Sequence, residues 1–301
     1  MKKITPITVP SQLLVVLGAC LWAFDGVLRR SLYVVSPLVL VTAEHGLGSL
    51  LVLPAGLKSL LKQKLSWSTL ALASAIALLS GLIGTAAFTG ALQASHFIPF
   101  SVVFLLQKLN TLFAISTAWL FLKEKLPRHF VIWAGIAIVA SFLVTFPGGR
   151  INLTTGAGTI QAALLAVTAA GAWGSSTVLS KLLLHRMPVV AATTLRFLLT
   201  TVFGLIVIGL MGQLPTVMLT GEQWLRLLII ALSTGLVALL IYYKGLSRIK
   251  ASQSAILELT FPLLAVLIDA FLYKVVLAPS QYLAAVVLLV AMWRVGDSPA
   301  H

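Results

Sequence analysis

Two charged side chains lie in the middle of long apolar stretches. Lys108 falls within residues 101–125 and Glu258 within residues 255–277. If these stretches span a bilayer, each charge lies near the midplane, where it costs about 2.5–3.5 kcal/mol on insertion scales. Such residues must face protein or water inside a helix bundle. The two could bind the charges of a zwitterionic substrate, or pair with each other in an empty site, and Glu258 could carry a proton. A permanent structural ion pair is the alternative.

Further polar residues interrupt the same and neighbouring apolar runs. Gln107 and Asn110 are three residues apart and share a helix face, where they either line a path or hydrogen-bond between helices. Arg196 could anchor a substrate carboxylate, or it could hold backbone carbonyls or pair with Glu44. His45 is a candidate for binding or titration, although a buried histidine is commonly just hydrogen-bonded.

Aromatic and hydroxyl residues complete the set of candidates. Trp22 and Trp173 could wall a cavity or pack between helices, and Ser176 could bind substrate or bond back to its own helix. Asp25 and Arg29 are four residues apart, which predicts a local helical ion pair near the outer surface.

The sequence lacks HExxH, GxSxG, a phosphate-binding loop and a Cys/His metal spacing. No metal or cofactor is therefore expected, and ATP-driven transport by this chain alone is disfavoured. A membrane enzyme acting on a lipid-type substrate and a non-transporting membrane subunit are the alternatives to a carrier.

Composition indicates a polytopic membrane protein. Of the 301 residues 59% are hydrophobic and 9% charged, and the mean hydropathy is +1.07. Apolar runs of about 20 residues are long enough to cross lipid. Ten such runs are predicted, at 11–32, 37–57, 68–91, 97–122, 127–146, 158–184, 188–211, 222–243, 249–273 and 279–295. Pro99 and Pro262 predict kinks in the fourth and ninth.

Most of the basic residues that give the net charge of +14 lie in the connections between the apolar runs. Most Lys and Arg residues fall in one alternate set of connections, which the positive-inside rule places in the cytoplasm together with both termini. Membrane topology explains this charge better than nucleic-acid binding does. The lipid bilayer of the cell (inner) membrane is therefore the expected environment.

The two halves of the chain match at an offset of 151 residues. Trp22 aligns with Trp173, Pro37 with Pro188, and further matches include Gly84 with Gly235. The chain is therefore predicted to consist of two five-helix repeats, residues 1–150 and 151–301. Because five crossings are an odd number, the second repeat must be inverted, an arrangement that supports alternating access at a midplane site.

The motifs within this pattern resemble the drug/metabolite transporter superfamily and, within it, the EamA-type transporters. The resemblance rests on Leu21-Trp22, on AWGS at 172–175, on LRFL at 195–198 and on LFLKEKL at 120–126. The chain departs from the family pattern at His45, where an arginine like Arg196 is usual, and at Val275, the counterpart of Glu124. The halves have therefore diverged.

The resemblance implies an all-α integral membrane protein with ten transmembrane helices. It also implies a secondary-active carrier that exports small polar metabolites, such as amino acids, with protons as a candidate coupling ion and a monomer or weak homodimer as the assembly. The central cavity would be lined by the residues named above: Lys108, Glu258, Gln107, Asn110, Arg196, His45, Trp22, Trp173 and Ser176.

Overall fold

A computed structural model of the chain describes residues 9–29, 32, 34–94, 106–107, 109–146, 149, 159–212, 219–272, 274 and 276–297. These residues form helices and no β-strand. The first half contains α1 (Ser11–Ala23), α2 (Asp25–Arg29), α3 (Pro37–Leu61), α4 (Trp67–Ile76), η2 (Ala77–Gly84), α5 (Thr85–Gln93), α7 (Leu109–Phe121) and α8 (Arg128–Thr145). The second contains α9 (Thr159–Leu184), α10 (Val189–Leu210), α11 (Gly221–Ile230), η6 (Ala231–Val237), α12 (Ala238–Leu246), α13 (Ala251–Leu257), α14 (Thr260–Leu272) and α15 (Pro279–Gly296).

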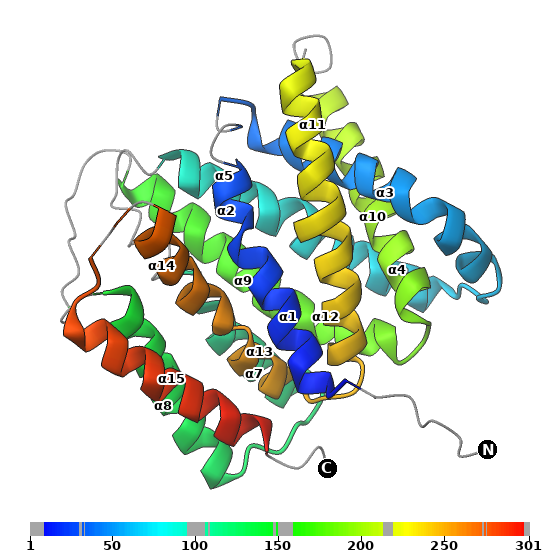
Figure 1. The fold of residues 1–301 in the computed structure, drawn as a ribbon. Coiled ribbons are helices and arrows are strands. Elements are labelled where there is room, and N and C mark those ends of the chain that lie inside the picture. Colours follow the sequence, from blue (N-terminus) through cyan, green and yellow to red (C-terminus); the bar gives the residue numbers. More distant parts are fainter. Residues whose placement is uncertain are drawn as a thin grey trace, which may run out of the picture.

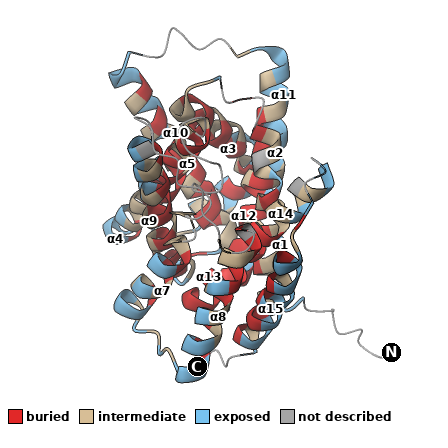
Figure 2. Ribbon diagram, turned by 90° about the vertical axis from the view of Figure 1, so that its left-hand side faces the viewer, coloured by how far each residue is buried: buried red, intermediate tan, exposed pale blue. Residues whose placement is uncertain are grey.

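The helices make a multi-pass membrane protein. Within the described residues, eight continuous helical segments are long and apolar enough to cross a bilayer, and two shorter apolar helices cover Leu109–Phe121 and Arg128–Val144. Side chains on the outside of the bundle are apolar, as at Leu210, which is 84% exposed, and Phe271, which is 76% exposed. Figure 2 shows the buried residues inside the bundle and exposed residues on its outer faces. Lipid explains these exposed apolar surfaces.

The two halves of the chain interlock in the bundle. The closest packing is between α3 and α10, α8 and α15, α7 and α9, and α1 and α12, and each of these pairs joins the first half to the second (Figure 1). Between α3 and α10 the contact is reciprocal, because Gly56 lies against Thr194 and Gly204 against Thr42. Small residues let helix backbones approach closely in a membrane.

Two long helices contain π-helical segments in their middle. The helix of residues 67–93 is π-helical at η2, and the helix of residues 221–246 is π-helical at η6. Wider i→i+5 turns change the hydrogen-bond register of the backbone, and such segments are frequent at functional sites. Both segments face the interior of the bundle, where they support the site described next.

The helix of residues 251–272 is broken between α13 and α14 at Glu258 and Leu259. The sequence predicted a kink from Pro262, and the break lies four residues earlier. The reason is that Pro262 has no N–H to donate to the Glu258 carbonyl, which accepts from the Phe261 N–H at 2.9 Å instead. The break places the Glu258 side chain inside the bundle.

Candidate functional site

A cavity of about 240 Å³ lies inside the bundle and is lined by helices of both halves. Helices α8 and α15 contribute no lining residue and pack outside it. Eight of the residues predicted from the sequence line the cavity: Trp22, His45, Gln107, Asn110, Trp173, Ser176, Arg196 and Glu258. Lys108 lies outside the described residues. The structure thus brings the predicted residues together, and their contact with a substrate stays a prediction.

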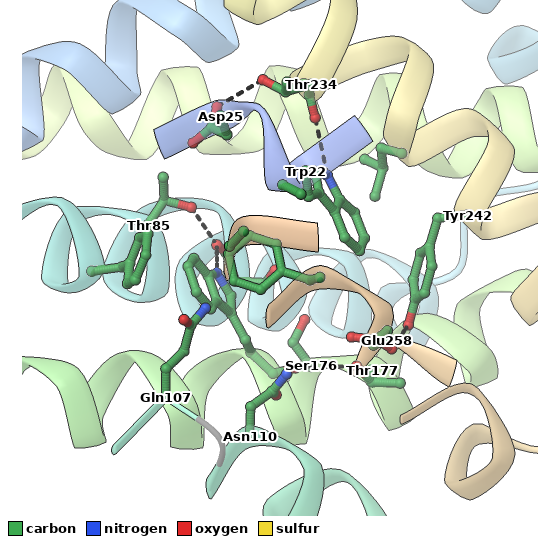
Figure 3. A pocket seen from close by; sticks show the side chains of 18 of the residues that line it. Trp22, Asp25, Thr85, Gln107, Asn110, Ser176, Thr177, Thr234, Tyr242 and Glu258 are labelled. Carbon is green, nitrogen blue, oxygen red and sulfur yellow. Dashed lines mark hydrogen bonds between the residues drawn. The ribbon is translucent and has the colours of Figure 1, made fainter. Parts of the chain in front are cut away.

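Trp22 of α1 forms one aromatic wall of the cavity. Its indole Nε1–H donates to the Thr234 carbonyl in η6 at 3.0 Å. Its ring lies 4.9 Å from the Tyr242 ring of α12, centroid to centroid. Figure 3 shows both rings at the edge of the cavity. The hydrogen bond fixes the polar edge of the indole and leaves its face for packing or stacking.

Trp173 of α9 has a matching arrangement in the other half. Its Nε1–H donates to the Ser80 carbonyl in η2 at 3.1 Å, and its ring lies 5.1 Å from that of Phe88. Each tryptophan is therefore held by a π-helical segment that belongs to the opposite half of the chain. The result is two anchored aromatic surfaces in one cavity.

Glu258 lies on the cavity wall at the break between α13 and α14. The Tyr242 hydroxyl donates to its Oε1 at 2.6 Å (Figure 3). The Ser254 hydroxyl donates to the same oxygen at 3.3 Å. Among the described residues no basic side chain lies within 4 Å of this carboxylate. Glu258 is thus solvated by hydroxyl groups, and its expected partner Lys108 is outside the described part of the chain.

Arg196 of α10 binds hydroxyl groups and makes no ion pair within the described residues. Its Nη1 donates to the Tyr243 hydroxyl at 2.9 Å and its Nη2 to Ser80 Oγ at 2.8 Å. The alternative in which Arg196 pairs with Glu44 does not occur. Tyr242 and Tyr243, adjacent on α12, therefore bind one charged group each, Glu258 and Arg196.

Glu44 instead belongs to a buried cluster with Arg29 and Asp25. Arg29 Nη2 donates to Glu44 Oε2 at 2.6 Å, and Arg29 Nε donates to Asp25 Oδ2. The local Asp25–Arg29 pair predicted from the sequence is present, and Arg29 is only 3% exposed, so the pair is buried inside the protein. Its position near the outer side of the membrane stays a prediction. Thr234 donates a hydrogen bond of 2.7 Å to Asp25 and ties the cluster to η6.

His45 of α3 lines the cavity, and one of its ring nitrogens is already hydrogen-bonded to its own helix. Its Nδ1–H donates to the Val41 carbonyl at 2.9 Å, and the ring lies 5.0 Å from that of Phe197. Because a carbonyl can only accept, the proton is on Nδ1 and the neutral ring has Nε2 as its acceptor. His45 is therefore a packed and hydrogen-bonded residue that borders the cavity.

Two side chains hold the turn between α12 and α13. Lys181 of α9 donates to the Leu246 and Ser247 carbonyls at 2.8 and 3.1 Å. Glu124 accepts from the backbone N–H groups of Ala251 and Ser252 at 2.7 and 3.0 Å. The C-terminus of α12 and the N-terminus of α13 each receive the charge that favours them.

The sequence did not single out Tyr242, Tyr243, Ser80, Phe88 or Thr234. Two adjacent tyrosines in an apolar run, out of five tyrosines in the chain, were a usable signal. Ser80 and Thr234 gave none, because isolated hydroxyl residues are common in apolar helices and their backbone carbonyl groups, which hold the two tryptophans, are not marked by any residue type. Among the described residues, no group of three or more His, Cys, Asp or Glu side chains is arranged to hold a metal ion.

Comparison with known proteins places this architecture in a family. The model of the EamA-like transporter family matches residues 10–146 and again residues 160–295. The chain belongs to the EamA-like transporter family. It is a membrane transporter for small molecules and not an enzyme, and the sequence-based assignment to the drug/metabolite transporters is confirmed.

One relative and one solved structure extend this result. The chain is 33% identical over 291 residues to the riboflavin transporter ImpX of Fusobacterium nucleatum subsp. nucleatum, covering 95% of this chain and 97% of that protein. A solved crystal structure of a protein at 18% identity aligns with 94% of this chain and 95% of its own, with a TM-score of 0.74. The second likeness shows a shared fold.

Proposed function

We propose that this EamA-family transporter carries riboflavin, or an uncharged flat heteroaromatic compound of that class. The observation that carries the proposal is the pair of anchored tryptophans, Trp22 and Trp173, which offer aromatic surfaces from both halves to one cavity. Stacking of a flat ring on an aromatic side chain contributes about 1–3 kcal/mol for nucleobases. Riboflavin presents a flat three-ring system with a polar edge and a neutral polyol chain. The riboflavin transporter among its relatives supports the same substrate class.

Hydroxyl groups on the cavity wall support a substrate that carries a polyol chain. Arg196 and Glu258 are hydrogen-bonded to the hydroxyl groups of Tyr243 and Tyr242, whereas Arg29 is paired with Asp25 and Glu44. A wall rich in hydroxyl groups suits the alcohol groups of a polyol.

For the transport mechanism we propose alternating access between two inverted five-helix repeats, with ten spans in total. Three features support the repeats: the offset of 151 residues, the π-helical segment in the third helix of each half, and a shared backbone conformation. Lys123 and Lys274, which the offset aligns, have φ values of 52° and 56°, rare for residues other than glycine. Glu258 is the candidate carrier of a coupling proton. The cell (inner) membrane, cytoplasmic termini and a monomer or weak homodimer complete the proposal.

The test is counterflow in proteoliposomes. Vesicles loaded with unlabelled riboflavin are diluted into a trace of labelled riboflavin, and the expected result is transient accumulation above that of protein-free vesicles. Competitors then define the class: neutral flavins should inhibit, whereas amino acids should not. Accumulation of a labelled amino acid without any flavin transport would overturn the proposed substrate. A repeat with an imposed pH gradient, in wild type and Glu258→Gln, tests proton coupling.

A further inference from the structure

Four residues that line the cavity have a buried polar atom without a hydrogen-bond partner: Arg29 (Nη1), Arg196 (Nε), Asn110 (Oδ1) and Ser176 (Oγ). The two uncharged side chains among them are Asn110 on α7 and Ser176 on α9, two helices that pack against each other. Ser176 is only 2% exposed. Buried polar groups are nearly always hydrogen-bonded in folded proteins, so each exception calls for an explanation. A ligand that supplies the missing partners is one such explanation for atoms that border a binding cavity.

Several helical hydroxyl groups of the protein bond back to their own helix, and Ser176 does not. Thr177, Thr194, Thr201 and Ser233 each donate to the carbonyl four residues earlier in the helix. This back-bonding is the ordinary way to satisfy a hydroxyl inside a membrane helix. The Ser176 hydroxyl does not make that bond, so it is free to donate to a ligand.

Close packing between α7 and α9 fixes the positions of the two side chains. A Cβ atom at Gly174 would lie 2.5 Å from the backbone oxygen of Asn110 and 3.0 Å from the Ala114 nitrogen. The helices therefore touch backbone to backbone, two residues before Ser176. Figure 3 shows Asn110 and Ser176 at the same side of the cavity. Side chains on rigidly packed helices are preorganised for recognition.

We propose that Asn110 and Ser176 read the imide edge of the flavin ring, the C2=O, N3–H and C4=O groups. This inference rests on the proposed function. Asn110 Oδ1 accepts the N3–H while its amide nitrogen donates to one flanking carbonyl, and the Ser176 hydroxyl donates to the other. A carboxamide offers an acceptor beside a donor, which complements the N–H and C=O of an imide. Asn110 Oδ1 and Ser176 Oγ then each gain a hydrogen-bond partner.

The test compares riboflavin with N3-methylriboflavin, which lacks the N–H donor. Inhibition constants for both are measured by competition against labelled riboflavin in proteoliposomes. Wild type should prefer riboflavin by about 10-fold or more, since the analogue leaves Asn110 Oδ1 unpaired. Asn110→Leu and Ser176→Ala should each bind riboflavin about 10-fold more weakly. The preference over the methylated analogue should fall to near unity in Asn110→Leu.

Thr193→Val is the matched control. Thr193 Oγ1 is also buried and unpartnered, but it lies on α10 and does not line the cavity, so this variant should keep both constants and their ratio. The ratio of the two inhibition constants, measured on one variant, does not depend on how much of the protein has folded. Equal binding of the two flavins by wild type, or an unchanged preference in Asn110→Leu, would overturn this inference alone. Absence of any flavin binding would overturn the proposed function as well.

Discussion

Removing the Glu124 carboxylate should destabilise the turn between α12 and α13. Glu124 follows α7 and accepts three hydrogen bonds at the start of α13, from the Ala251 N–H, the Ser252 N–H and the Ser252 hydroxyl. These are donors that a helix N-terminus leaves without intrahelical partners. Glu124→Ala removes every acceptor, whereas Glu124→Gln keeps one side-chain oxygen and loses the charge.

The expected cost of Glu124→Ala can be built from these contacts. Loss of a side-chain cap costs about 0.5–2 kcal/mol, and loss of a negative charge at a helix N-terminus costs about 0.3–1 kcal/mol more. The free energy of unfolding should therefore fall by about 2 kcal/mol, a change of roughly 30-fold in the folded-to-unfolded ratio. Glu124→Gln should lose about half as much.

The assay is thermal unfolding of detergent-purified protein, followed by reaction of a thiol-specific dye with Cys20. Cys20 is the only cysteine in the sequence and lies on α1, which packs against α12, α13 and α14. Glu222→Ala is the matched control, because Glu222 also begins a helix but its side chain is 72% exposed. Equal melting temperatures of Glu124→Ala and Glu222→Ala would refute the capping role of Glu124.

Three further outcomes can be checked with the same melting assay. Arg29→Met leaves the buried Asp25 and Glu44 without a cation and should lower the free energy of unfolding by about 3–5 kcal/mol. An unchanged melting temperature would contradict these two ion pairs. Gly174→Ala should lower the free energy of unfolding by about 1–3 kcal/mol and weaken flavin binding, because the new methyl group collides with the backbone of α7. An unchanged melting temperature would show that α7 and α9 separate at no cost. Lys123→Val should cost about 1–2 kcal/mol at a φ of 52°, while Lys123→Gly should not destabilise, and the reverse order would contradict that conformation.

Helix positions were predictable because apolar runs and prolines mark them in the sequence. Helices α3 and α15 begin at Pro37 and Pro279, as the apolar runs indicated. Convergence of the polar residues was also foreseen, since a polar side chain in an apolar run must face the interior of the bundle. Glu258 and Arg196 both line the cavity for this reason.

The partners of those residues could not be read from the sequence. Arg196 binds the Tyr243 and Ser80 hydroxyl groups, and Glu44 binds Arg29, because helix rotation and neighbour choice decide which side chains meet. The anchoring of Trp22 depends on a carbonyl in a π-helical segment, and no residue type marks such a segment. Side-chain chemistry is encoded locally, whereas pairing arises from the assembled bundle.

Riboflavin counterflow by two tryptophan variants in proteoliposomes tests the aromatic binding site most directly. Trp173→Leu removes an aromatic surface of the cavity, and Trp67→Leu removes a tryptophan that is 86% exposed and does not line it. We expect Trp173→Leu to raise the riboflavin half-saturation constant by about 5–150-fold, because it loses a stacking contribution of about 1–3 kcal/mol. Trp67→Leu should transport riboflavin like wild type. Equal riboflavin transport by the two variants would contradict the stacking role of Trp173.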